Sequence, residues 1–129
     1  MGNYSYSRLG IYWAMYRLAL HIEECAKKFK RADKYTIGAE LRHAARLLVC
    51  KIRKINRIKD EEKIAYLDKL KDELDDLDVT LSMCGELSVF SSYGEWFSAV
   101  EMLSDVSEQL KKLTKYFNER QNQRGIRPQ

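Results

Sequence analysis

The chain has 129 residues, of which 45% are hydrophobic and 33% charged, with only six glycines and one proline. This length is typical of a single domain with its own core, and the scarcity of turn-forming residues favours a helical bundle and argues against an all-β fold. The formal net charge is +4, a total that by itself favours no class of partner.

Two amphipathic helices are predicted in the first half of the chain. Apolar residues recur at steps of three and four along residues 11–29, which predicts a helix over about residues 7–29. A second series of the same kind predicts a helix over about residues 36–57, with Thr36 and Glu40 as plausible capping residues at its start.

Two more helices are predicted in the second half. Apolar residues along 67–84 keep the same steps, and the acidic residues 60–62 suit the N-terminal turn of a helix because its dipole favours negative charge there. Residues 91–94 predict a loop. The core stripe expected for the fourth helix is Trp96, Val100, Leu103, Ser107, Leu110, Thr114 and Phe117. We expect an all-α, up-down-up-down antiparallel four-helix bundle over residues 1–120, followed by a polar, frayed tail over residues 121–129.

The cysteines and the first predicted helix bear on the cellular compartment. Cys25, Cys50 and Cys84 are far apart and form no CxxC pair, so they predict neither a disulfide framework nor a zinc site. Arg17 and His21 interrupt the apolar run of the first helix, so we expect neither a secretion signal nor a membrane anchor. The prediction is a cytoplasmic protein.

Sequence motifs for catalysis or metal binding are weak. Glu40 and His43 form a Glu-x-x-His motif of the kind found in di-iron bundles, but there is no second copy and both residues lie off the apolar face. A catalytic cysteine–histidine pair is also not indicated. Cys25 and Cys84 fall on the core face of their predicted helices, and for Cys50 the nearby His43 has no visible residue to orient its ring. No phosphate loop, Rossmann fingerprint or hydrolase elbow is present. We therefore expect no catalytic residue, metal or cofactor, and a protein that is not an enzyme.

Charge is distributed very unevenly along the chain. Residues 27–59 carry a formal charge of +10, residues 60–108 carry −11, and residues 109–129 carry +5. Such asymmetry indicates either internal pairing between a basic and an acidic helix or a basic surface for a polyanion, and charge alone leaves both open.

A basic ridge is predicted along the second helix. At about 100° per residue, Arg42, Arg46, Arg53 and Arg57 fall within about 60° of one another and away from the apolar stripe. The residues predicted to flank this ridge are Lys51 and Lys54 on the same helix and Lys27, Lys28, Lys30, Arg31 and Lys34 before it. The alternative is a solvated face neutralised by acids of the third helix, but the absence of acids over residues 41–59 favours binding of phosphates or an acidic partner.

The first predicted helix carries a second apolar surface. Tyr12, Trp13, Tyr16 and Leu20 lie opposite its core stripe. We call these four residues the aromatic face. A subunit or partner interface is the favoured interpretation, and a wider core stripe is the alternative.

The segment over residues 34–42, KYTIGAELR, resembles a signature that opens the second helix in a family of small four-helix proteins. That signature is Tyr/Phe-Thr-Leu-Gly-x-x-Leu, and Ile37 stands here where the family has leucine. The family comprises the accessory variability determinant proteins of diversity-generating retroelements and the related proteins encoded by intervening sequences in bacterial large-subunit rRNA genes. An aromatic-rich first helix, a long third helix and a Trp-x-x-x-x-x-x-Leu stretch from Trp96 to Leu103 extend the resemblance over nearly the whole chain, although the specific residues are few.

The resemblance implies a homopentameric barrel of four-helix bundles with a basic surface. In a diversity-generating retroelement such a protein works beside the reverse transcriptase, which copies a template RNA into mutagenic cDNA, and it has no known chemistry of its own. The predicted partners are therefore the reverse transcriptase, RNA and DNA, and further copies of the chain. The intervening-sequence relatives share the fold, so a structural oligomer or a protein adaptor with an acidic protein partner is the alternative.

Overall fold

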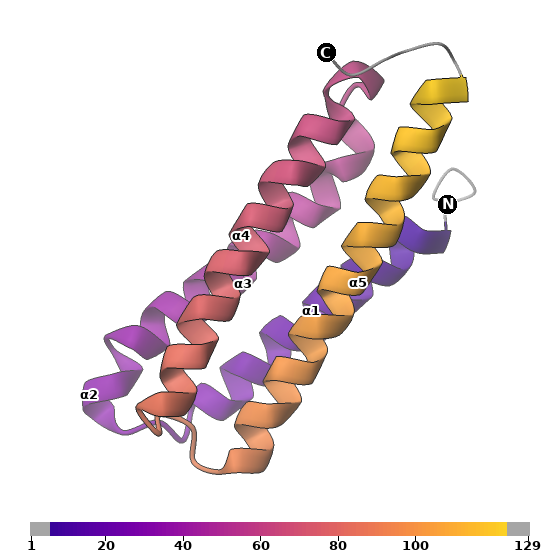
Figure 1. The fold of residues 1–129 in the computed structure, drawn as a ribbon. Coiled ribbons are helices and arrows are strands. Elements are labelled where there is room, and N and C mark those ends of the chain that lie inside the picture. The colour runs from indigo at the N-terminus through magenta and orange to yellow at the C-terminus, as the bar shows by residue number, and fades with distance from the viewer. Residues whose placement is uncertain (1–5, 124–129) are drawn as a thin grey trace.

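The computed structural model describes residues 6–123, which form an all-α four-helix bundle with no strand in that part of the chain (Figure 1). The elements are α1 (Tyr6–Ala26), α2 (Arg31–Lys34), α3 (Ile37–Arg53), the 3-10 turn η1 (Lys54–Arg57), α4 (Asp60–Glu86) and α5 (Tyr93–Gln123). The four long helices alternate in direction along the chain (Figure 1). The predicted fold class is confirmed.

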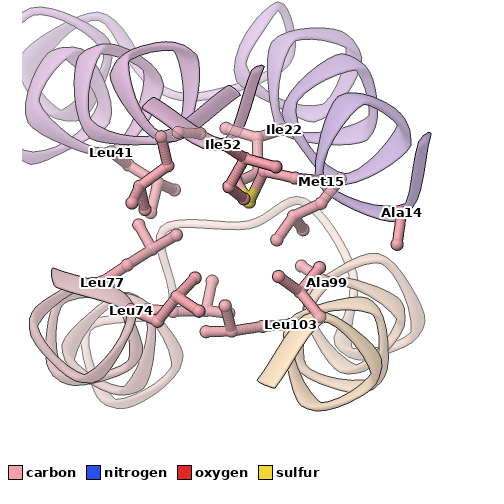
Figure 2. Close-up of a cluster of buried hydrophobic side chains, with 14 of the residues drawn as sticks. Ala14, Met15, Ile22, Leu41, Ile52, Leu74, Leu77, Ala99 and Leu103 are labelled. Atoms are coloured by element: carbon pink, nitrogen blue, oxygen red, sulfur yellow. The ribbon is translucent and has the colours of Figure 1, made fainter. Parts of the chain in front are cut away.

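The four long helices stand at the corners of a square. Both α1 and α4 pack against α3 and α5, so that α1 and α3 form one side of the bundle and α4 and α5 form the opposite side (Figure 2). Leucine and isoleucine side chains fill the centre, among them Ile22, Leu41, Ile52 and Leu77. Burial of each such side chain stabilises the fold by about 1.5–3 kcal/mol.

The core stripe of α5 agrees with the predicted one only in part, because Leu103, Leu110 and Phe117 are buried as expected and the other four predicted residues are not. The buried residues of this helix are Ala99, Leu103, Val106, Leu110, Leu113, Phe117 and Gln121. Trp96, Val100, Ser107 and Thr114 were expected at the centre but are half-buried at its rim. Ala99 and Val106 are buried beside the correctly predicted Leu103 and Leu110, because their small side chains let α5 approach its neighbours closely.

Several helix boundaries also differ from the prediction. α1 ends at Ala26, although Phe29 beyond it is still buried, and α3 ends at Arg53, after which the chain tightens into η1. Tyr93 and Gly94, predicted as loop, form the first turn of α5.

The C-terminal boundary of the bundle lies beyond residue 120. α5 continues to Gln123 because Gln121 is buried and its Nε2 donates a hydrogen bond to the backbone oxygen of Asp60. The first three residues of the predicted tail are therefore helical, and residues 124–129 lie outside the described part of the chain.

The segment over residues 34–42 forms the junction between α2 and α3. The Thr36 hydroxyl donates to the Ala32 oxygen at 2.6 Å, and the Arg42 guanidinium donates to the Lys34 oxygen at 2.7 Å. Gly38 is buried against Phe29. These residues fold the chain back from α1 onto α3.

Candidate nucleic-acid interface

Arg46 of α3 borders a groove between α1 and α3. The apolar residues of α3 point into the core, and the helical phase then turns the ridge towards α1. Arg46 Nη2 lies 3.4 Å from Glu23 Oε2 of α1. The groove has a volume of about 410 Å³ and is lined by Tyr16, Ala19, Leu20 and Glu23 of α1 and by Arg46, Val49 and Cys50 of α3. The basic ridge, through Arg46, and the aromatic face, through Tyr16 and Leu20, therefore border one groove, although the sequence predicts them as two separate surfaces.

Most of the aromatic face is open to solvent. Trp13, Tyr16 and Leu20 are 46%, 38% and 51% exposed. The centroids of the Trp13 and Tyr16 rings are 5.5 Å apart, and the rings pack edge-to-face, so each limits the movement of the other. Tyr12 is half-buried and packs against the core, so for this residue the alternative of a wider core stripe holds.

The predicted basic residues do not form one continuous strip. Lys27, Lys28, Lys30, Arg31 and Lys34 lie at the α2 end of the bundle, whereas Arg53, Lys54 and Arg57 lie at the η1 end. The 17 residues of α3 separate the two groups, a distance of about 25 Å at 1.5 Å per residue.

Several cations at the α2 end are used within the fold. Lys27 pairs with Glu24, Lys28 pairs with Glu95, and Lys34 Nζ donates to the Lys27 oxygen. The half-buried Arg42 bonds the backbone oxygens of Lys34 and Gly38. Lys30 and Arg31 are exposed, and within residues 6–123 no ion pair holds them.

The acids of α4 neutralise little of the basic ridge. Lys51 pairs with Glu73, but Arg46 pairs with Glu23 of α1, and Asp75 pairs with Lys71 of its own helix at 3.1 Å. Among the described residues, no arginine of the ridge forms an ion pair with α4.

The η1 end carries the accessible positive charge. Arg53, Lys54 and Arg57 are exposed, and none of them has an ion-pair partner within the part of the chain that the structure describes. Because a 3-10 turn advances about 120° per residue, Arg57 does not continue the α-helical phase from which its place on the ridge was predicted.

Arg17 borders the aromatic face and was not among the predicted binding residues. It is exposed on α1, and at about 100° per residue it lies within about 60° of Trp13 and Leu20. The formal charge of residues 1–26 is zero, so a comparison of the charges of successive segments does not indicate Arg17. Its helical phase relative to Trp13 would have revealed it.

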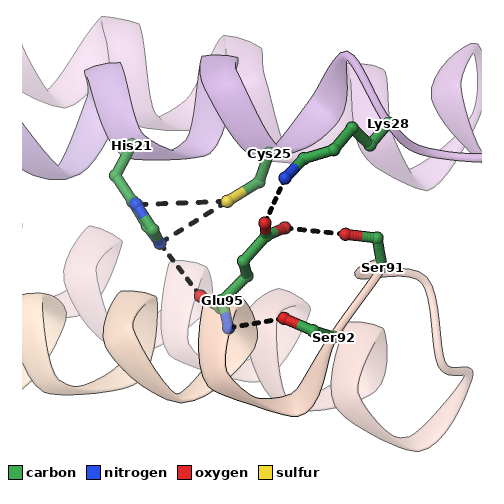
Figure 3. Close-up of polar contacts among 6 residues, drawn as sticks. All are labelled: His21, Cys25, Lys28, Ser91, Ser92 and Glu95. Carbon is green, nitrogen blue, oxygen red and sulfur yellow. Dashed lines mark hydrogen bonds and ion pairs between the residues drawn. The ribbon is translucent and has the colours of Figure 1, made fainter.

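A polar cluster joins α1 to the start of α5 (Figure 3). His21 Nε2 donates to the backbone oxygen of Glu95 at 2.9 Å and lies 3.5 Å from Cys25 Sγ. The Glu95 carboxylate accepts hydrogen bonds from Lys28 and Ser91, which hold its pKa below the ordinary value. Burial raises the pKa of the Cys25 thiol to about 11. A thiol that stays protonated at neutral pH is a poor nucleophile. The His21–Cys25 contact lies within α1, whereas the hydrogen bond from His21 to the Glu95 backbone oxygen joins α1 to α5.

The remaining predicted chemistry is not assembled into a site. Glu40 and His43 are both exposed. Across residues 6–123, no three His, Cys, Asp or Glu side chains come together in a way that could hold a metal ion. No helix in the same range is both long and apolar enough to cross a membrane.

No protein-family model matches the chain, and no curated protein matches its sequence.

Proposed function

We propose that this protein is a non-catalytic, nucleic-acid-binding accessory subunit of a diversity-generating retroelement. It binds template RNA and cDNA beside the reverse transcriptase in the cytoplasm. One observation supports nucleic-acid binding most directly: Arg53, Lys54 and Arg57 are exposed at one end of a segment of charge +10, and no ion pair among the described residues neutralises them.

The chemistry of these cations suits phosphate. Guanidinium groups bind phosphate oxygens in a bidentate manner, and each phosphate that is neutralised releases counterions. Three such contacts give a slope of log affinity against log salt of about −2 on a single strand. Phosphate contacts carry no sequence information, so we expect strong salt dependence and weak sequence preference.

The choice of a retroelement rests on the resemblance over residues 34–42. Thr36, Gly38 and Arg42 in this segment fold the α2–α3 junction, and none of them lines the groove. The segment therefore supports kinship of fold, and the reverse transcriptase is the partner that the resemblance implies.

A double variant tests nucleic-acid binding. Arg53→Gln with Arg57→Gln should weaken binding of a labelled RNA, measured by fluorescence anisotropy across a salt series, and should flatten the salt slope by about 1.4 for a single strand. Lys69→Gln with Lys112→Gln is the matched control, because both lysines are exposed and the charge change is the same. Equal affinities and slopes for the two double variants would contradict the proposal.

A structural oligomer of the intervening-sequence type, or an adaptor for an acidic protein, is the second candidate. The exposure of Trp13, Tyr16 and Leu20 favours it, because contiguous apolar surface is typical of interfaces. The family expectation is a homopentamer, which sedimentation equilibrium measures directly. A monomer that binds RNA would leave only the first proposal.

A further inference from the structure

The α1–α3 groove presents flat aromatic surfaces that a ligand can reach. The Trp13 ring contacts both Tyr12 at 5.2 Å and Tyr16 at 5.5 Å. Tyr12 is half-buried against the core, so it anchors the outer two rings to the bundle. Exposed rings that are already held in place lose little conformational entropy when a ligand stacks on them.

The facing wall of the groove carries exchangeable positive charge. The Arg46 and Glu23 side chains are 67% and 41% exposed, and ion pairs between such exposed groups are weak. Arg46 can therefore exchange this carboxylate for a phosphate. Arg53 lies seven residues further along α3, about 10 Å away, a distance that spans about three nucleotides of a stacked strand.

The antiparallel register brings the two kinds of residue to the same level. Arg46 lies opposite Glu23. Trp13 is ten residues before Glu23 on α1. Because α3 runs antiparallel to α1, the residues that follow Arg46, up to Arg53 and η1, approach the level of Trp13. The lining of the groove ends at Tyr16 on α1 and Cys50 on α3. Trp13 and Arg53 each lie three residues further along these helices, about one turn, towards the same end of the bundle.

We infer that the α1–α3 groove binds single-stranded nucleic acid, with bases stacked on Trp13 and Tyr16 and phosphates held by Arg46 and Arg53. This inference rests on the proposed function and adds the form of the ligand. In a duplex each base is stacked on its neighbours, and the deep major groove of A-form RNA excludes side chains. Only an unpaired strand offers base faces and phosphates together, which is the combination that aromatic rings beside arginines recognise.

A second copy related by a two-fold axis is a poorer occupant of the same groove. In a two-fold symmetric dimer a surface patch meets its own counterpart. Contact through the aromatic face would then bring the bordering Arg17, Arg46 and Arg53 towards the same arginines of the other copy, and like charges across an interface are unfavourable. A polyanion neutralises these charges.

The test uses the full chain and two probes of equal charge, a labelled oligouridine and a labelled, fully paired RNA duplex with blunt ends. Trp13→Leu with Tyr16→Leu keeps apolar side chains but removes the π surfaces. Tyr116→Leu is the control, because Tyr116 is 45% exposed on α5, away from the groove. Circular dichroism establishes that the variants keep wild-type helicity, and sedimentation gives their masses.

We expect the wild type to prefer oligouridine, and the Trp13/Tyr16 variant to lose about tenfold or more of that affinity while Tyr116→Leu loses little. Equal affinity for duplex and oligouridine, or an unchanged affinity in the Trp13/Tyr16 variant, would overturn the inference while leaving nucleic-acid binding intact. A variant whose mass falls while its RNA affinity holds would show that a second copy covers the groove. Absence of binding to either probe by the wild type would instead refute the proposed function itself.

Discussion

Gly38 occupies a place at the α2–α3 junction where a methyl group has no room. A Cβ atom there would lie 2.7 Å from the backbone oxygen of Asp33 and 2.9 Å from Cδ2 of Phe29. Phe29 is only 5% exposed and packs edge-to-face on Phe90 at 5.0 Å, so its ring cannot move without opening the core. We therefore expect Gly38→Ala to destabilise the protein.

The size of this effect follows from two opposing contributions. Alanine is the better helix former by up to about 1 kcal/mol, whereas forcing an extra carbon into a packed site costs about 1–3 kcal/mol. The backbone contact with Asp33 places the cost towards the upper end, which leaves a net loss of about 1–2 kcal/mol. With an unfolding entropy of about 2.1 cal/mol/K per residue, the melting temperature should fall by about 4–7 °C.

Thermal and urea denaturation followed by far-UV circular dichroism measure this loss. Gly94→Ala is the control, because a Cβ at Gly94 meets nothing within 4 Å, and it should leave the melting temperature unchanged or slightly raised. A Gly38→Ala protein as stable as the wild type would refute the steric reasoning.

Three further predictions concern other parts of the bundle. Gly85→Ala should destabilise it by about 1–3 kcal/mol in urea, because the new Cβ would lie 2.6 Å from the Trp96 ring, whose Nε1 donates to the Leu81 oxygen; a Trp96→Leu background should reduce that loss. The pKa of Glu95 is lowered in the folded protein. Its ionised carboxylate therefore stabilises the fold above the pKa that it has in the unfolded chain, and this stabilisation is lost as the pH falls through its pKa in the folded protein. Glu95→Gln should accordingly lose less stability than the wild type between about pH 5 and pH 3. Exposed Cys50 should react with a thiol reagent in the folded protein while buried Cys25 and Cys84 do not, and equal labelling of all three would contradict the packing described.

The accuracy of the sequence prediction varied with the size of the apolar side chains. In α4 the core is built of leucines at strict steps, and Leu67, Leu70, Leu74, Leu77 and Leu81 are all buried as predicted. In α5 the predicted Leu103 and Leu110 are buried, but Trp96 and Thr114 lie at the rim and Ala99 is buried instead. Alanine carries little hydrophobic signal, but its small size is what a close helix contact requires.

The candidate site was predictable in its parts but not in its assembly. Helical phase predicted the exposure of Arg46, Arg53 and Trp13, because phase depends only on local geometry. It could not show that Arg42 is held by the Lys34 oxygen, since that contact depends on the short helix α2. Nor could it show that the ridge and the aromatic face share a groove, which depends on how α1 packs against α3.

The bundle begins and ends at the same side. The N-terminal end of α1 and the C-terminal end of α5 lie at the same end of the bundle, where α5 extends beyond α1 (Figure 1), and the two helices pack against each other. The order of the helices around the square therefore closes on itself. A circular permutant that joins the ends with a flexible linker and opens the chain between α4 and α5 would turn the α5–α1 pair into a helical hairpin. It would leave α1, α3 and the connection between them uncut, so an intact groove could be displayed on a chain whose new ends lie at the opposite side of the bundle.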